Sequence, residues 1–396
     1  MPGTLSTSQA AIVVAAALHA RTAEDAQKLE ALIGQCVGGK YQRPLFDVWG
    51  HFGIVSPTGS FDHILLENVT NMQDAVVDLE ALLLYKTDQH VPFKTPREAA
   101  TQLLKGKSEK EIAEMVSVEF FDSGEPRSIT ATFRDRGCGM LPEQVPTSIF
   151  GLGSSRKERL FWQQGAFGLG AKHTYRNAKA VVLVTRRDPR LLAAGQDDRI
   201  CVAVLRWEAG TKGNDLYYLV SERWNPELRQ GLPFSAPAHE FPDFEPGTYV
   251  ALITYGTEGF HRNRLGDERS FDTVLNTRLF KPITRVRFSN SAIQGRDRHE
   301  FLGGLALRLE NRGDETPSGS QDLPFNIGGK TFLLPVTYYL FAAQGEPGER
   351  RKFVAKDHCV IFTSNGQVHK HWTPSEWRYK TKLKKLADRV LIVVET

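Results

Sequence analysis

Cysteine is scarce in this chain: only four occur among 396 residues, and no two of them form a CxxC pair. They are Cys36, Cys138, Cys201 and Cys359. The wide spacing excludes the common structural zinc patterns and argues against a disulfide framework, so a reducing interior is expected.

Long apolar runs are also missing. No stretch of about 18 apolar residues occurs, so no membrane span is predicted. The segment "AAIVVAAALHA" near the start is short and follows no basic region, which favours a buried first helix over a signal peptide. These features predict a cytoplasmic protein without a membrane partner.

A strong excess of charge is absent as well. The chain has 50 basic and 46 acidic residues, a formal charge of +4 that permits contact with nucleic acid without arguing for it. Its length suggests two domains, because single cores rarely grow beyond about 250–300 residues. A hydrophobic content of 41% and a charged content of 24% are ordinary for globular proteins.

The periodicity of the sequence predicts an α+β fold. A helical arm is expected over residues 1–60, and the run "FDHILLENVTNMQDAVVDLEALLLY" predicts a long helix. The segment "SVEFFDSGEPRSITATFRD" predicts a β-hairpin, and later runs predict further antiparallel strands. From about residue 260 the pattern restarts with a helix and strands. The final apolar strand fits either a buried C-terminal strand or a longer native chain.

The long helix carries the first candidate site. Glu67, Asn71, Asp74 and Asp78 lie on one face of it, opposite an apolar face. A carboxylate four residues before an amide can polarise water while the amide oxygen binds Mg²⁺, which prefers oxygen ligands. A solvated polar face is the alternative.

Two glycine-containing motifs follow. In "DRGCGM", Asp135 ends a strand, and a carboxylate there can accept a hydrogen bond from an exocyclic amine; a plain turn is the alternative. In "WQQGAFGLGAKHTY", three glycines precede a predicted helix and suit an anion site, unless the loop is only a connection. It lacks the GK[ST] of a Walker loop and the βαβ context of a dinucleotide fingerprint. A strand opening with Gly247 and Thr248 comes last.

The order of these four motifs resembles that of the GHKL superfamily, which includes gyrase B, the large heat-shock chaperone, histidine kinases and MutL. The resemblance spans about residues 60–255 and is most specific at ExxxNxxDA and DxGxGM. It implies a Bergerat-type α/β sandwich over residues 61–258 with a lid at about 140–172. Residues 259–396 would form a smaller α/β transducer domain.

The resemblance also implies the role of each residue. Glu67 would activate water, Asn71 would bind Mg²⁺ and Asp74 would border the nucleotide. Asp135 and Thr248 would bind adenine. The remaining nucleotide-binding positions implied are Gly137, Gly139, Met140, Ser154, Ser155, Lys157, Gly165, Ala166, Phe167, Gly168, Leu169 and Gly170, with Lys172 added because it lies nearby.

The lid sequence resembles that of topoisomerase VI B subunits and MORC-type ATPases. In such proteins a lysine of the second domain reaches the γ-phosphate, and Lys380 or Lys382 is expected to do so here, with Lys370 a third candidate and a solvated basic helix the alternative. His63 lies within the predicted ATP helix, so it is a poor phosphoacceptor. The inserted helical stretch after the first motif distinguishes the chain from gyrase.

The expected activity is therefore that of a Mg²⁺-dependent ATPase that dimerises on binding ATP. The resemblance suggests a clamp or switch acting in a DNA-related or anti-phage defence process, with nucleic acid and an effector protein as partners. A heat-shock-type chaperone and a nucleotide-sensing interaction module are the alternatives. Salt-dependent DNA binding would separate the first hypothesis from both.

Overall fold

The computed structural model describes most of the chain. The ranges are 7–38, 40–42, 61–86, 91–150, 163–164, 175–210, 213–220, 224–225, 230–257, 259, 270–292, 299–311, 317–346 and 348–396. The chain divides into two compact units, one made of Met1–Arg262 with Val286–Glu300 and the other of Asn263–Arg285 with Phe301–Thr396. Helices and mixed sheets form both units, so the fold is α+β as predicted.

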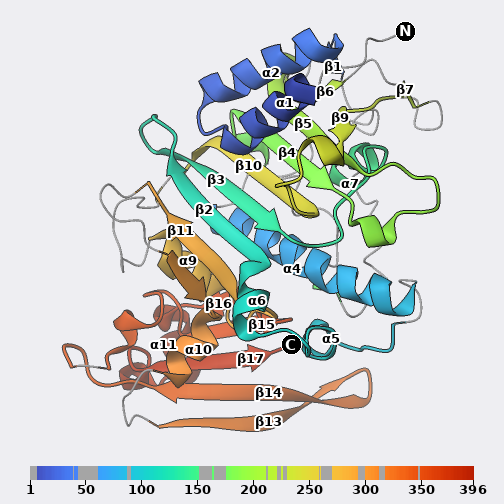
Figure 1. Ribbon diagram of the computed structural model, residues 1–396. Helices are drawn as coiled ribbons and strands as arrows, with labels where there is room; N and C mark the ends of the chain where they lie inside the picture. Colours follow the sequence, from blue (N-terminus) through green and yellow to red (C-terminus); the bar gives the residue numbers. More distant parts are fainter. Residues whose placement is uncertain are drawn as a thin grey trace. The chain divides into compact units, whose positions relative to one another are not determined.

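A mixed sheet with the strand order β1-β6-β5-β4-β10-β3-β2-β11-β12 organises the first unit, and β9 pairs with β5 (Figure 1). Its strands are β1 (Lys40–Gln42), β2 (Val116–Asp122), β3 (Ser128–Asp135), β4 (Ala180–Arg186), β5 (Arg199–Gly210), β6 (Gly213–Val220), β9 (Phe234–Pro237), β10 (Gly247–Gly256), β11 (Val286–Asn290) and β12 (His299–Leu302). The central pairs are antiparallel, whereas β11 runs parallel to β2. A separate ladder joins β7 (Trp224–Asn225) to β8 (Gln230–Gly231).

Helices α1 (Thr7–His19) and α2 (Ala23–Val37) cover one face of this sheet (Figure 1). Thr22 starts α2 through a capping box with Asp25, which satisfies backbone amides at the helix start. Apolar residues of both helices share a core with alternate residues of β4, β5 and β10. The part of the expected arm that forms α1 and α2 therefore packs into the core of the first unit.

Helix α4 (Phe61–Tyr85) covers the opposite face and contacts β2 and β3. The ring of its first residue, Phe61, is tilted against two others: its centroid lies 6.1 Å from that of Phe120 on β2 and 5.6 Å from that of Tyr255 on β10. Strands β3 and β4 are buried along nearly their whole length; α4 contacts β3, and α1 and α2 contact β4. The long helix and the β2–β3 hairpin predicted from the sequence are confirmed.

The segment between α4 and β2 forms two short helices where the sequence suggested one helical stretch. They are α5 (Pro96–Leu103) and α6 (Glu109–Glu114). Thr95 and Ser108 cap their first turns, so a new helix begins at Ser108. Helix α7 (Val145–Phe150) follows β3. A helix was also predicted after the glycine loop; its described part, Tyr175–Asn177, is a 3₁₀ turn.

The second unit has a five-stranded sheet with the order β13-β14-β17-β15-β16. Its elements are α9 (Phe271–Arg278), α10 (Gly304–Glu310), β13 (Ser318–Ile327), β14 (Lys330–Leu340), β15 (Val360–Ser364), β16 (Gln367–Trp372), α11 (Pro374–Thr381) and β17 (Val390–Glu395). Apolar residues of α10, β15, β16 and β17 form its core. The hairpin of β13 and β14 is largely exposed and carries apolar side chains such as Phe325 and Leu333.

The basic helix predicted near the end of the chain is shorter than expected. Helix α11 stops at Thr381, because Lys382 adopts the left-handed conformation with φ of 64°. A separate 3₁₀ turn covers Lys384–Leu386. The final predicted strand is confirmed as β17, which pairs antiparallel with β14 and parallel with β15.

Candidate nucleotide-binding site

The polar face of α4 supplies the first part of the candidate site. Glu67 and Asn71 are half-buried, and Asp74 is only 1% exposed. Gln73 beside it is fully buried. At Asp74 this face is therefore covered by protein, which does not fit the alternative of a solvated stripe.

The residues that cover it come directly before the glycine loop. The backbone N–H of Gln164 donates to Asp74 Oδ1 at 2.9 Å, and its side-chain amide donates to Gln73 Oε1 at 3.2 Å. The amide of Gln163 donates to Asp78 Oδ1. Two adjacent polar residues of α4, Gln73 and Asp74, and Asp78 one turn later thus hold Gln163 and Gln164 on the helix that carries Glu67 and Asn71.

Asp135 lies at the end of β3, where the chain turns from the sheet toward α4. Its Oδ1 atom accepts two backbone hydrogen bonds, from Gly137 at 2.8 Å and from Thr248 at 3.2 Å. Within the described part of the chain, Oδ2 accepts no hydrogen bond. The carboxylate is thus held by one oxygen while the other stays available as an acceptor.

The surroundings of Asp135 disfavour its charge. The residue is 4% exposed, and burial raises the pKa of its carboxyl to about 6, although the two backbone hydrogen bonds and the nearby Arg134 oppose that rise. Burial in turn lowers the pKa of Arg134 to about 10. A carboxyl group with a strongly raised pKa beside a loop is a common property of functional sites.

Two glycines let the loop after Asp135 lie directly against its neighbours. A Cβ at Gly137 would be 2.5 Å from the backbone carbon of Ala75 on α4, and the next amide, of Cys138, donates to the Ala75 carbonyl at 3.1 Å. Gly139 has a φ of +57°, and a Cβ there would be 1.8 Å from the Arg186 carbonyl oxygen. Glycine is needed at both positions because backbone occupies the space of a side chain.

The strand β10 brings Thr248 to the same place, because its first residues pair with the end of β4. Thr248 is opposite Thr185, and their hydroxyl oxygens are 3.2 Å apart. Thr185 also accepts a hydrogen bond from the backbone N–H of Met140 at 3.0 Å. Sequence reasoning missed Thr185, since a threonine in the apolar run "AVVLVTRR" is typical of any strand.

The structure therefore brings together Asp135, Gly137, Gly139, Met140 and Thr248, and it places Glu67, Asn71 and Asp74 along the adjoining helix. Ten other predicted residues lie outside the described part of the chain: Ser154, Ser155, Lys157, Gly165, Ala166, Phe167, Gly168, Leu169, Gly170 and Lys172.

The two predicted lysines belong to the second unit. The Nζ atom of Lys380 lies 5.0 Å from the ring centre of Trp372, and that of Lys382 lies 4.9 Å from the ring centre of Tyr379. Both are exposed: Lys380 lies in the last turn of α11, and Lys382 follows the helix. Their contact with a phosphate stays a prediction, as does the third candidate, Lys370 on β16.

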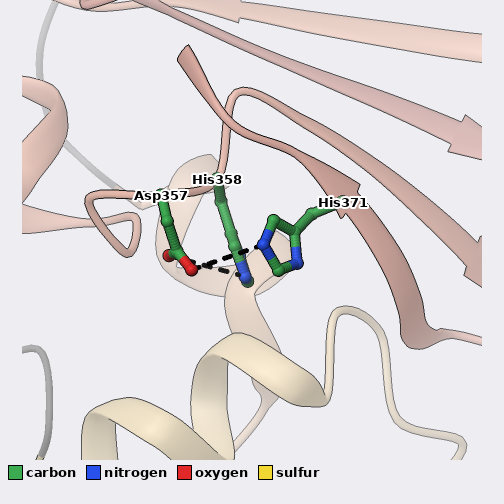
Figure 2. A group of neighbouring side chains, drawn as sticks. All are labelled: Asp357, His358 and His371. Atoms are coloured by element: carbon green, nitrogen blue, oxygen red, sulfur yellow. Dashed lines mark ion pairs between the residues drawn. The ribbon is translucent and has the colours of Figure 1, made fainter. Parts of the chain in front are cut away.

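A second group of polar side chains was not predicted. Asp357, His358 and His371 lie together in the second unit, with one nitrogen or oxygen of each within 4.8 Å of the others (Figure 2). Burial lowers the pKa of His358 to about 3, and the hydrogen bond from His371 holds the pKa of Asp357 well below its usual range. The histidines are 13 positions apart in sequence, a spacing that no short metal motif would reveal.

No protein-family model matches this sequence, and no curated protein does. Among the helices that the structure describes, none combines the length and the apolar character needed to cross a membrane.

Proposed function

We propose that this protein is a Mg²⁺-dependent ATPase of the GHKL type. The observation that carries the proposal is the carboxylate of Asp135. It is buried and fixed through Oδ1, and its Oδ2 is available beside the loop of Gly137 and Gly139, which packs on α4. A carboxylate oxygen that accepts no other hydrogen bond among the described residues suits the exocyclic amine of adenine, which can donate to it.

The donor set near Asp135 also fits a nucleotide. The hydroxyl of Thr248 can hydrogen-bond a ring nitrogen directly or through water. Thr185, whose own hydroxyl donates to the Gly247 carbonyl at 3.1 Å, lies beside it. Guanine presents a carbonyl where adenine presents its amine, so the free carboxylate oxygen favours adenine. This chemistry supports ATP over GTP as the ligand.

Helix α4 supplies the residues that would act on the phosphates. Asn71 has an amide oxygen suited to Mg²⁺, which when bound would neutralise phosphate charge. Glu67 lies one turn before it on the same face and would take the proton of the attacking water. The anchoring of Gln163 and Gln164 on Asp78 and Asp74 supports a place for the glycine loop next to both residues.

The output of this ATPase would be a change in association. ATP would close the lid and favour a homodimer, and hydrolysis would release it. We place this clamp in a DNA-related or anti-phage defence process, with a chaperone or a nucleotide sensor as alternatives. DNA binding that weakens steeply with salt would favour the clamp.

The rate of ATP hydrolysis by the variant Glu67→Gln tests the proposal. The variant should bind ATP as the wild type does, while its turnover falls by about 10²–10⁴-fold, the usual loss when a general base is removed. Glu80→Gln is the matched control, because Glu80 lies on the same helix in an ion pair with Lys107. Absence of ATPase activity in the wild type, or equal activity in Glu67→Gln, would contradict the proposal.

Association is tested by light scattering with Mg²⁺. A non-hydrolysable ATP analogue should produce dimers, whereas ADP should bind and leave the resting state unchanged. The double variant Gly168→Val, Gly170→Val should lose the dimers, because two added side chains would block the approach of backbone amides to phosphate. Identical distributions with ADP and the analogue would show that ATP does not control association.

A further inference from the structure

The group formed by Asp357, His358 and His371 lies where β15 and β16 meet. Asp357 and His358 come just before β15, and His371 is near the end of β16, opposite Ile361 in the antiparallel register. The backbone N–H of Cys359 donates to the Trp372 carbonyl at 2.9 Å, which continues this pairing beyond the strand. Three residues from two segments are thus fixed side by side by the sheet.

The distances within the group are short. His371 Nε2 is 3.3 Å from Asp357 Oδ2, and His358 Nε2 is 3.9 Å from Asp357 Oδ1 (Figure 2). Ligands at about 2.0–2.1 Å from a tetrahedral zinc ion lie about 3.3 Å from one another. The closest pair already has that separation, and side-chain rotation would bring the third atom to it.

His358 is the most buried member of the group. It is only 3% exposed and faces Asp357 through Nε2. The ring nitrogen that is buried without a hydrogen-bond partner among the described residues is the other one, Nδ1. A neutral imidazole is also the form that binds a metal ion.

The loop that carries two of these residues is held by Arg350. This buried guanidinium donates to the carbonyls of Lys356, at 3.0 Å, and of His358. Groups that fix the orientation of ligands are a regular feature of metal sites. Arg350 therefore holds the backbone on both sides of Asp357.

We propose that Asp357, His358 and His371 bind a divalent transition-metal ion, with zinc as the best fit. Two imidazoles and one carboxylate match the three protein ligands of open zinc sites, in which a further position is left to water or to another ligand. Mg²⁺ is disfavoured, because it prefers oxygen ligands. Asp357 is largely exposed, so ions can reach the group from solvent. This site is independent of the proposed ATPase activity.

The experiment is a titration of the chelator-treated 396-residue chain with ZnCl₂ in excess Mg²⁺, with the heat of binding measured by calorimetry. Saturable binding of one zinc ion per chain is expected, and Co²⁺ should show the strong visible absorption of a four-coordinate site. Asp357→Asn and His371→Ala should each weaken zinc binding by at least about tenfold, since outer-shell changes alone cost about 10–100-fold. Both residues are partly exposed, so these variants should fold.

His369→Ala is the matched control, because His369 is an exposed histidine on the same strand outside the group. It should retain wild-type affinity, and circular dichroism should show that all variants remain folded. Two results would overturn the proposal: no saturable zinc binding by the wild type, or affinity in folded His371→Ala equal to that of the wild type. The group would then be a hydrogen-bonded Asp–His cluster only.

Discussion

Asp135 reduces the stability of the protein that contains it. The folded state raises the pKa of this carboxyl from 3.8 to about 6, so at neutral pH the fold holds a charge that burial disfavours. A residue selected for stability alone would be neutral at this position. In the proposed function, the hydrogen bond to adenine would offset this cost.

Asp135→Asn should separate the effect of the carboxylate on ATP binding from its effect on stability. The asparagine Oδ1 can keep both backbone hydrogen bonds, while its NH₂ would meet the adenine amine, donor against donor. ATP affinity should fall about tenfold or more, since an unmade hydrogen bond to a charged group costs about 1.5–3 kcal/mol. The ligand-free variant should be more stable at pH 7, by on the order of 2 kcal/mol. Calorimetry with ATP and urea unfolding measure the two quantities.

The same residue predicts a dependence of stability on pH. Between about pH 6 and 4, the folded state binds a proton that the unfolded state does not, so the contribution of Asp135 to stability rises as the pH falls. The wild type should therefore gain stability relative to Asp135→Asn over this range. A constant difference between the two proteins, or unchanged ATP affinity in the variant, would contradict the role given to Asp135.

At the scale of elements, the packing of the loop after β3 against α4 should depend on the missing side chain of Gly137. In Gly137→Ala the new Cβ would lie 2.5 Å from the backbone carbon of Ala75, so the loop or α4 would have to shift. Overpacking of this kind costs about 1–3 kcal/mol of stability. Chemical unfolding should show the loss, and ATP binding should weaken with it.

Gly106→Ala provides the comparison, because a Cβ at Gly106 has no atom within 4 Å among the described contacts. Its stability should stay within about 0.5 kcal/mol of the wild type, as for most surface changes. If both variants unfold at the wild-type urea concentration, the loop does not depend on close contact with α4.

Local opening of the β13–β14 hairpin should be easier at one end than at the other. β17 pairs with β14 from Val336 to Leu340, whereas the part near the turn extends beyond that pairing and is exposed. Local opening is easiest where few buried contacts hold the backbone. Amide exchange should therefore be faster over residues 323–333 than over 336–340. Equal protection of the two segments would contradict this prediction.

The sequence predicted elements where local chemistry determines them. The "DSGEP" turn identified the β2–β3 hairpin, and the apolar periodicity identified α4. It did not reveal that β11 pairs parallel with β2, because the two are far apart in sequence and no local signal specifies a parallel partner. Thr185 and the Asp357 group were missed because their neighbours are also distant in sequence; the antiparallel pairing of β4 with β10 and of β15 with β16 brings them close.

At the scale of the whole molecule, the chain leaves the first unit, contributes residues 263–285 to the second and returns with β11. Phe288 on that strand is 1% exposed and meets Phe120 edge-on, with ring centroids 5.4 Å apart. Phe288→Ala should destabilise the protein by about 3–5 kcal/mol, the usual cost of removing a buried phenylalanine. Phe301→Ala, at a position that is 50% exposed, should have a much smaller effect in the same urea titration.

This return of the chain has a consequence for biosynthesis. Domains generally fold from the N-terminus as the ribosome releases them. Here β2 is made early, but its parallel partner β11 emerges only after α9, an element of the second unit, has been synthesised. Until then one edge of β2 and the ring of Phe120 lack the cover of β11. A nascent chain stalled before residue 286 should therefore be cleaved by protease more readily than one stalled after β11 has left the exit tunnel.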